Sequence, residues 1–285
     1  MKHPLPEDNA VPAADFLRTI ASTESMAENS VSYRLAFDDP VFLARPEVRG
    51  IRFQLELLKP DLILRENQID HTIVVFGSAR FASAEDAEAM MAQASDDASR
   101  QQAEKALQNS KFYESARVLG QLVARHNLSQ ISPKRRLHIC TGGGPGIMAA
   151  ANQGAHETGD LSIGLNIKLP FEQRPNPYLT PALCFQFHYF ALRKMHFLLR
   201  ARAIVVYPGG YGSFDELFEV LTLIQTKKIT PMPVVLVGTD YWTKVVNFQM
   251  MAELGLIARE DYESIHFVDT AHDAWQAIAT WYGLT

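Results

Sequence analysis

Glu216 is the acidic side chain best placed for chemistry, because it closely follows a glycine-rich loop. Residues 208–216 read PGGYGSFDE and come straight after an apolar run typical of a strand. Backbone N–H groups in such a loop, at the positive end of a helix, attract an anion such as phosphate. A carboxylate one helical turn away would stabilise positive charge on a ribose ring. The loop therefore indicates a nucleotide or sugar-phosphate substrate.

A second interpretation of the same residues is purely structural. Ser213 precedes an apolar helical pattern and Glu216 stands three residues later, which is the spacing of a capping box. The cap alone would stabilise the helix by on the order of 1 kcal/mol. The three glycines ahead of Ser213 favour the binding interpretation, since a helix that needs only a cap does not require them.

Two further glycine loops also follow predicted strands. The first contains Gly77 and Ser78, and the second is the run Gly142, Gly143, Gly144, Pro145, Gly146. Uncovered N–H groups in the second loop could bind phosphate or ribose, or the glycines could serve tight helix–strand packing. Ile147 occupies the position where a dinucleotide fingerprint has its third glycine, and the sequence has no Gly-Lys pair for a P-loop. Both observations argue against an ordinary NAD-binding or P-loop site.

A cationic pair, Arg193 and Lys194, lies in a helical pattern upstream of the PGGYG loop. Arg193 could bind a phosphate or the leaving base through its planar fork of donors, or could form a surface charge pair. We interpret Arg200 and Arg202 as structural or solvated. His188 and His196 lack metal-ligand spacing, so we expect no metal site.

The elements that must position these residues alternate in type from residue 71 onward. Near-continuous apolar strands separated by helices predict an α/β fold, a doubly wound Rossmann-like parallel sheet with helices on both faces. The predicted strands are Thr72–Phe76, Leu137–Cys140, Leu161–Leu165, Leu183–Phe187, Ala203–Tyr207, Val234–Val237 and Ile265–Val268. The predicted helices are Glu85–His126 in two pieces, Ile147–Thr158, Phe190–Ala201, Phe214–Thr226, Trp242–Leu254 and Ala271–Tyr282.

We predict two regions, 1–70 and 71–285. The first would be a loose tail over 1–12 followed by a mostly helical extension, interrupted at Pro40, Pro46 and Pro60. It offers no recognisable chemistry and could cover the main domain or form an oligomer contact. Within the second region, residues 85–110 are rich in Ala, Gln and charge, which indicates an exposed helix or a mobile insertion.

Composition excludes several classes of function. The formal net charge is −5, and hydrophobic residues make up 47% of the 285 residues. A mildly acidic globular chain has no general attraction to nucleic acid or to anionic lipid, so we expect neither as a partner. The two cysteines, Cys140 and Cys184, do not form a disulfide framework and fit buried thiols in a reducing compartment. With no apolar signal segment or membrane-spanning run, we expect a cytoplasmic protein.

Taken together, GGGPGIM, the Arg-Lys pair and PGGYGSFDE resemble the LOG family over roughly residues 71–285. This family contains cytokinin-activating phosphoribohydrolases and bacterial nucleotide nucleosidases, often labelled "possible lysine decarboxylase". The long N-terminal region and the 85–110 segment resemble its larger bacterial branch.

The resemblance implies hydrolysis of the N-glycosidic bond of nucleoside 5′-monophosphates to free base and ribose 5-phosphate. AMP is the expected substrate, with cytokinin nucleotides as a further candidate, and no cofactor is needed. By resemblance the catalytic residues are Glu216 and Arg193. The 5′-phosphate ligands would be Gly209, Gly210, Gly212 and Ser213. Further substrate contacts would come from Gly77, Ser78, Gly142, Gly143, Gly144, Gly146 and Lys194. The resemblance also implies a homodimer or higher homo-oligomer.

The chain departs from the family at two places. Ser213 replaces a threonine, which preserves the hydroxyl, and Phe190-Ala191-Leu192 replaces Met-His-Glu, which leaves recognition of the base open. A decarboxylase would need a Schiff-base lysine in a pyridoxal phosphate site, and the sequence offers none that we can identify. Two alternatives to the hydrolase are a non-catalytic carrier of nucleotide or molybdenum cofactor and, less favoured, a Rossmann oxidoreductase.

Overall fold

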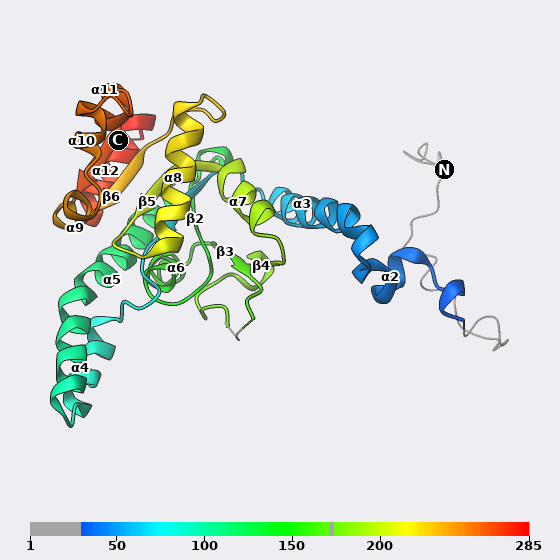
Figure 1. The fold of residues 1–285 in the computed structure, drawn as a ribbon, viewed down its shortest axis with the longest axis horizontal. Helices are drawn as coiled ribbons and strands as arrows, with labels where there is room; N and C mark the ends of the chain where they lie inside the picture. Colours follow the sequence, from blue (N-terminus) through cyan, green and yellow to red (C-terminus); the bar gives the residue numbers. More distant parts are fainter. Residues whose placement is uncertain (1–29, 171–173, 285) are drawn as a thin grey trace. The chain divides into compact units, whose positions relative to one another are not determined.

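Seven parallel strands form one sheet, as the apolar runs predict (Figure 1). The structure is a computed structural model that describes residues 30–170 and 174–284. The strand order is β4-β3-β2-β1-β5-β6-β7, and every neighbouring pair is parallel. The strands are β1 Thr72–Phe76, β2 His138–Thr141, β3 Ser162–Ile167, β4 Cys184–Phe187, β5 Ala201–Val206, β6 Val234–Val237 and β7 Ile265–Val268.

Both faces of this sheet are covered, which explains why its strands are apolar throughout. In β1, Val74 and Phe76 pack into one core while Ile73 and Val75 pack into the other. Helices α3, α7, α8, α9 and α10 contribute to the first core, and α5, α6 and α12 contribute to the second. The Rossmann-like doubly wound fold is therefore confirmed.

The helices agree with the predicted segments to within a few residues, with two exceptions. Their bounds are α2 Pro40–Ala44, α3 Arg49–Glu66, α4 Ala84–Gln93, α5 Asp97–Ser129, α6 Ile147–Glu157, α7 Phe190–Leu199, α8 Tyr211–Gln225, α9 Thr239–Val245, α10 Phe248–Glu253, α11 Arg259–Glu263 and α12 Ala271–Tyr282. The predicted helix Trp242–Leu254 is instead two helices, because the backbone is extended at Val246 and Asn247 caps α10 with its side chain. Helix α11 was not predicted.

The prediction that Pro60 interrupts the N-terminal extension is wrong. Pro40 and Pro46 do begin helical segments, but Pro60 lies inside the continuous 18-residue helix α3. Proline removes one intrahelical donor, which leaves the carbonyl of Glu56 without its usual partner four residues later. In this fold the Glu56 carbonyl instead lies 3.2 Å from Nε2 of His196 on α7. A tertiary contact therefore replaces the missing helical bond.

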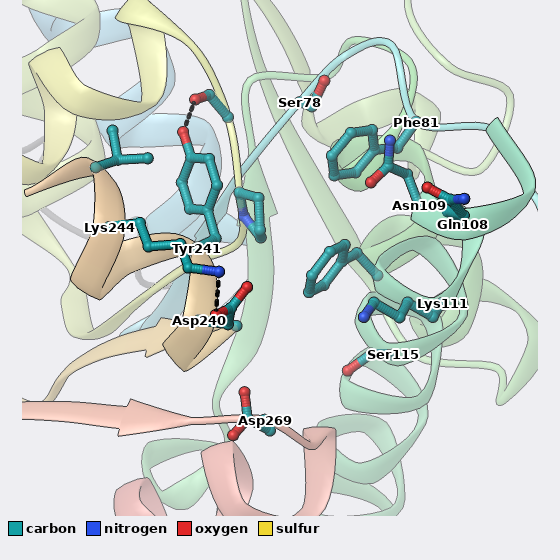
Figure 2. A pocket seen from close by; sticks show the side chains of 15 residues that line it. Ser78, Phe81, Gln108, Asn109, Lys111, Ser115, Asp240, Tyr241, Lys244 and Asp269 are labelled. Carbon is teal, nitrogen blue, oxygen red and sulfur yellow. Dashed lines mark hydrogen bonds and ion pairs between the residues drawn. The ribbon is translucent and has the colours of Figure 1, made fainter. Parts of the chain in front are cut away.

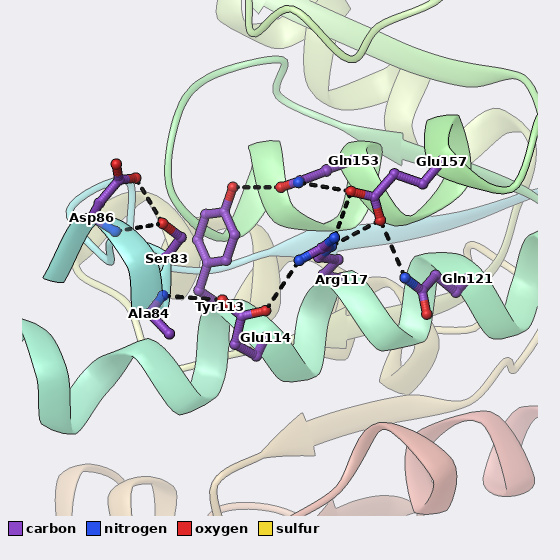
Figure 3. A network of polar contacts seen from close by, with 9 residues as sticks. All are labelled: Ser83, Ala84, Asp86, Tyr113, Glu114, Arg117, Gln121, Gln153 and Glu157. Carbon is purple, nitrogen blue, oxygen red and sulfur yellow. Dashed lines mark hydrogen bonds and ion pairs between the residues drawn. The ribbon is translucent and has the colours of Figure 1, made fainter. Parts of the chain in front are cut away.

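The segment 85–110 lies in two exposed helices, α4 and the first part of α5. Of the two predicted alternatives, an exposed helix or a mobile insertion, the first is confirmed. Helix α4 lies alongside the first half of α5 (Figure 1). The second half of α5 packs against α6, where Arg117 forms an ion pair with Glu157 at 2.7 Å and Tyr113 donates to Gln153 at 2.8 Å (Figure 3). This polar seam fixes α6, the helix that follows the GGGPG loop.

The chain divides into two compact units after Arg52, within α3. Residues 53–70 thus belong to the unit that contains the sheet. In the described part of the first unit, residues 30–52, Asp39 caps α2 by accepting from the N–H groups of Val41 and Phe42 at 2.9 and 3.0 Å. The predicted tail over 1–12 lies outside the described residues. Within 30–170 and 174–284, every helix is too short or too polar to cross a lipid bilayer.

Close packing of α5 on α6 predicts a stability effect at Gly154. A Cβ atom built there would meet the carbonyl of Arg117 in the facing helix. We expect Gly154→Ala to lower the free energy of unfolding by about 1–3 kcal/mol, as overpacking does, measured by urea denaturation. The control Gly50→Ala lies in a helix with open space around the new methyl group and should be neutral or stabilising by up to about 1 kcal/mol. Equal stability of Gly154→Ala and the wild type would contradict this packing.

Candidate active site

The three glycine loops meet at the carboxyl edge of the sheet, next to strand β1. Because β1 lies between β2 and β5, the chain leaves neighbouring strands in opposite directions and opens a crevice there. The N–H of Ser78 donates to the carbonyl of Pro208 at 2.9 Å, and the N–H of Ile147 donates to the carbonyl of Ser78 at 3.1 Å. The loops after β1, β2 and β5 are therefore hydrogen-bonded to one another.

The capping-box interpretation of Ser213 and Glu216 is wrong. Helix α8 begins at Tyr211 and not at Phe214, and its N-cap is Gly210, whose backbone is extended. Ser213 is the third helical residue, and its N–H donates to the carbonyl of Gly210 at 3.0 Å. The loop glycine starts the helix without a side-chain cap, so the Glu216 carboxylate is not used to satisfy the helix end.

Free backbone donors gather where α8 begins. Among the described residues, none accepts a hydrogen bond from the N–H groups of Gly209, Gly210, Tyr211 or Gly212. Gly210 and Gly212 have no atom within 4 Å of the position of a Cβ, whereas a Cβ on Gly209 would meet the side chain of Ser213. Consecutive uncovered N–H groups at the positive end of a 15-residue helix form a site that suits a phosphate group.

Glu216 lies in the second turn of α8 and is buried, with 7% of its surface exposed. In the described part of the chain its carboxylate has no hydrogen-bond or ion-pair partner. Burial raises the pKa of Glu216 to about 7, although the charges of Lys194 and Arg193 act to lower it. A carboxyl group that titrates near neutral pH within a site is typical of acid–base and electrostatic catalysis.

Arg193 on α7 is one of two cations, with Lys194, whose charge lowers the pKa of this carboxyl group. Its Nε donates to the carbonyl of Leu165, within β3, at 2.7 Å. Its Nη2 lies 2.5 Å from where a Cβ on Gly142 would be, so a side chain at 142 would displace the end of the guanidinium. Burial lowers the pKa of Arg193, and the charge of Glu216 opposes that effect. Arg193 is thus a half-buried, positioned cation and not a member of a surface charge pair.

Lys194 also acts on the Glu216 carboxylate by its charge, but its ion pairs are with two other carboxylates of α8. Its Nζ lies 2.7 Å from Asp215 and 3.1 Å from Glu219. Burial lowers the pKa of Lys194, but the hydrogen bonds to Asp215 and Glu219 outweigh burial and the net pKa is raised. The structure therefore places Lys194 as an ionic bridge between α7 and α8, beside the predicted site.

A buried polar network fixes the GGGPG loop, and sequence reasoning missed its key member, Asn176. The N–H of Asn176 donates to the carbonyl of Gly143 at 2.9 Å, and its Nδ2 donates to the carbonyl of Gly144 and to Oδ1 of Asn152, both at 3.0 Å. Gly143 has a positive φ of 71° and donates its own N–H to Thr141 Oγ1 at 3.0 Å. Gly143 and Gly144 thus shape the loop through their backbone groups.

Gly77 and Gly146 serve close approach between loops. A Cβ on Gly77 would lie 2.8 Å from the side chain of Ile147. Gly146 has a φ of 68°, and a Cβ there would meet the carbonyl of Ser78 and the backbone of Ala79. These two glycines, singled out in the sequence as ligand contacts, are required by packing.

A pocket of about 820 Å³ borders the same edge on the β6 side. Figure 2 shows Phe81, Asn109 and Lys111 on one wall and Asp240, Tyr241 and Lys244 on the other. The pocket shares Ser78 and Gly209 with the predicted site but not Glu216 or Arg193. The hydroxyl of Tyr241 donates to the carbonyl of Gly209 at 2.6 Å, which anchors the PGGYG loop to α9.

The described residues contain no group of three or more His, Cys, Asp or Glu side chains arranged to hold a metal ion. Cys140 is buried and Cys184 is half-buried, and both are free thiols. Of the two predicted alternatives for Arg200, structural or solvated, the structure shows the first: Arg200 donates to Asp61 Oδ1 at 2.7 Å and to the carbonyl of Ile69 at 2.9 Å.

The fold and the edge loops define a Rossmann-like α/β protein whose loops and charged side chains converge beside β1. A family model described as "Possible lysine decarboxylase" matches residues 148–278. The pyrimidine/purine nucleotide 5′-monophosphate nucleosidase of Escherichia coli is 29% identical over 145 residues, covering 46% of this chain and 31% of that protein. The cytokinin riboside 5′-monophosphate phosphoribohydrolase LOG3 of Arabidopsis thaliana is 30% identical over 144 residues, covering 49% and 65%.

The predicted resemblance is confirmed: over about half of its length the chain is similar to nucleotide nucleosidases and cytokinin phosphoribohydrolases of the LOG family. The matched region spans about a third of the length of the first relative and just under two thirds of the second. Two solved structures also align. TM1055 has a TM-score of 0.46 and 20% sequence identity, covering 74% of this chain and 99% of that one. The Moco carrier protein of Chlamydomonas reinhardtii has a TM-score of 0.42 and 18% identity, covering 75% of this chain and 99% of that one. These low scores leave the fold to be judged from the chain's own topology.

The site does not fit the pyridoxal phosphate that the word decarboxylase implies. A Schiff base to that cofactor needs a lysine that can lose its proton. Lys194, the lysine of the Arg-Lys pair, is held between Asp215 and Glu219, and these contacts favour the charged amine. We derive no decarboxylase chemistry from this site.

The raised pKa of Glu216 predicts a stability that depends on pH. The folded protein holds this proton up to about pH 7, whereas the unfolded chain releases it near the ordinary value of 4.5. Stability is therefore lost as the pH rises through this window, by on the order of 3 kcal/mol. We expect Glu216→Gln to match the wild type near pH 4.5 and to be the more stable of the two at pH 8. A stability difference that stays constant across that range in urea titrations would argue against the buried, unpaired carboxylate.

Proposed function

We propose that this protein hydrolyses the N-glycosidic bond of nucleoside 5′-monophosphates, giving free base and ribose 5-phosphate. The observation that carries the proposal is the pairing of a buried, unpartnered Glu216 with the uncovered N–H groups at the start of the same helix. The names of the Escherichia coli and Arabidopsis relatives both specify a 5′-monophosphate as the compound acted on, which supports this substrate class. AMP is the first substrate to test, and cytokinin nucleotides are the second.

The residues would divide the chemistry between them. The N–H groups of Gly209, Gly210 and Gly212 would bind the 5′-phosphate and orient the nucleotide. As the C1′–N bond breaks, the Glu216 carboxylate would stabilise the positive charge that develops on the ribose. Arg193 would stabilise electron density on the departing base. Water supplies hydroxide to C1′ and a proton to the base, so the products balance without a cofactor.

We also propose a cytoplasmic homo-oligomer. Free thiols at Cys140 and Cys184 suit a reducing compartment. Exposed apolar side chains on α7, namely Phe190, Met195 and Leu199, support contact with a second chain.

Glu216→Gln should separate catalysis from phosphate binding. We expect release of base from AMP to fall at least about a hundredfold, because the developing ribose charge loses its counter-ion. Affinity for ribose 5-phosphate should change little, since the N–H groups of α8 remain. The assay incubates the protein with a panel of nucleoside monophosphates and measures base and ribose 5-phosphate by chromatography.

Glu253→Gln, which removes an exposed carboxylate on α10, is the matched control and should keep full activity. Normal turnover in Glu216→Gln would remove Glu216 from the mechanism. Binding of intact nucleotide by the wild type with no release of any base would favour the carrier instead.

The pH dependence of kcat/KM should report the same carboxyl group. If Glu216 acts as a carboxylate, kcat/KM for AMP rises with pH and levels off above the pKa of about 7. The rising limb should be missing from the residual activity of Glu216→Gln. A profile that falls as the pH passes 7 would assign Glu216 the role of a proton donor instead.

A further inference from the structure

Helix α3 contacts α7, the helix that carries Arg193, through one residue that has no place in the motifs. Glu56 lies in the middle of α3, more than a hundred residues before α7 in the chain. Its Oε1 accepts from the N–H of His188 at 3.0 Å, and its Oε2 accepts from the N–H of Tyr189 at 3.2 Å. Both carboxylate oxygens are therefore used at the start of α7.

This contact supplies the cap that α7 lacks in its own sequence. The N-cap residue of α7 is Tyr189, which forms no side-chain cap. Unsatisfied N–H groups at a helix start are stabilised by an acceptor, and a negative charge there also favours the helix dipole. Glu56 provides both from a neighbouring helix.

The capped residue is linked directly to Arg193. The carbonyl of Tyr189 accepts from the N–H of Arg193 at 3.2 Å, so Tyr189 makes both hydrogen bonds, one through its N–H and one through its carbonyl. On its other side, Arg193 is fixed by the bond from Nε to the carbonyl of Leu165. The position of the Arg193 guanidinium thus depends on where α7 begins, and Glu56 fixes that point.

Pro60 adds a second contact between the same two helices. Since Pro60 has no N–H, the carbonyl of Glu56 has no partner within α3 and meets Nε2 of His196 at 3.2 Å. The rings of Phe53 and Tyr189 lie edge to face with centroids 4.3 Å apart. At the far end of α7, Arg200 contacts Asp61 at 2.7 Å. The contacts thus run along the whole length of α7.

We propose that Glu56 is a positioning residue for Arg193, and that Pro60 keeps the Glu56 carbonyl available to α7. The proposal rests on the proposed nucleotide hydrolysis for its kinetic consequence. It assigns the part of α3 from Phe53 onward a role in the site: this segment fixes the position of α7, so that Arg193 reaches the Leu165 carbonyl beside Gly142.

The kinetic test compares Glu56→Ala and Glu56→Gln with the control Glu66→Ala. Glu66 is an exposed carboxylate on α3 with no partner among the described residues. We expect Glu56→Ala to lower kcat for AMP about tenfold while KM changes less than about twofold, because a displaced catalytic group slows chemistry more than it weakens phosphate binding. Glu56→Gln keeps one acceptor oxygen and should recover part of this loss. Glu66→Ala should match the wild type.

A double-mutant cycle separates positioning from general damage. If Glu56 acts through Arg193, the effect of Glu56→Ala on kcat should shrink to less than about twofold in an Arg193→Ala background. An undiminished effect in that background would overturn the proposal.

Hydrogen exchange measured by mass spectrometry provides a readout that does not need activity. Backbone N–H groups in peptides covering 188–194 should exchange faster in Glu56→Ala than in the wild type or Glu66→Ala. Pro60→Ala is a second variant, chosen because alanine favours the helix and α3 will still form; it should speed exchange around His196 alone. If the wild type releases no base from any nucleotide, the proposed function fails while exchange still tests the contact. Unchanged exchange in Glu56→Ala would overturn the positioning role directly.

Discussion

The burial of the Glu216 carboxylate without a hydrogen bond is the constraint on which the rest of the site depends. A buried ionised group is costly unless opposite charge or ligand compensates it. Here the compensation is incomplete, since Arg193 and Lys194 lower the pKa of Glu216 but do not return it to its ordinary range. Gly142 leaves space beside the guanidinium of Arg193, and Asp215 and Glu219 hold the ammonium group of Lys194. Both positive charges favour the ionised form of the buried Glu216.

Two helices have to be held in register for this arrangement to exist. Helix α8 carries Glu216 and α7 carries Arg193, and they belong to consecutive strand–helix units on one face of the sheet. Lys194 ties α7 to α8 through Asp215 and Glu219, while Glu56 and Asp61 tie α7 to α3. Arg193 therefore sits in a helix braced from both sides, as electrostatic preorganisation requires.

Much of the fold could be predicted from the sequence, because parallel strands covered on both faces are recognisable as short apolar runs. All seven strands and most of their flanking helices lie close to the predicted segments. The errors fall where a local rule competes with tertiary structure. Ser213 and Glu216 have capping-box spacing, yet Gly210 starts the helix. Pro60 predicts a break, yet His196 takes over the carbonyl that the proline leaves unpaired.

The site was predictable only where its residues belong to loops that follow strands. Asn176 and Glu56 act through hydrogen bonds to backbone groups distant in the chain, and no local spacing reveals such contacts. The glycines also show that a sequence does not reveal what will pack against a residue. Gly142 and Gly146 are needed to admit a guanidinium and a carbonyl, whereas Gly210 and Gly212 face open space and leave donors uncovered. A run of glycines in a sequence cannot separate these two uses, because both depend on what the fold brings against the missing side chain.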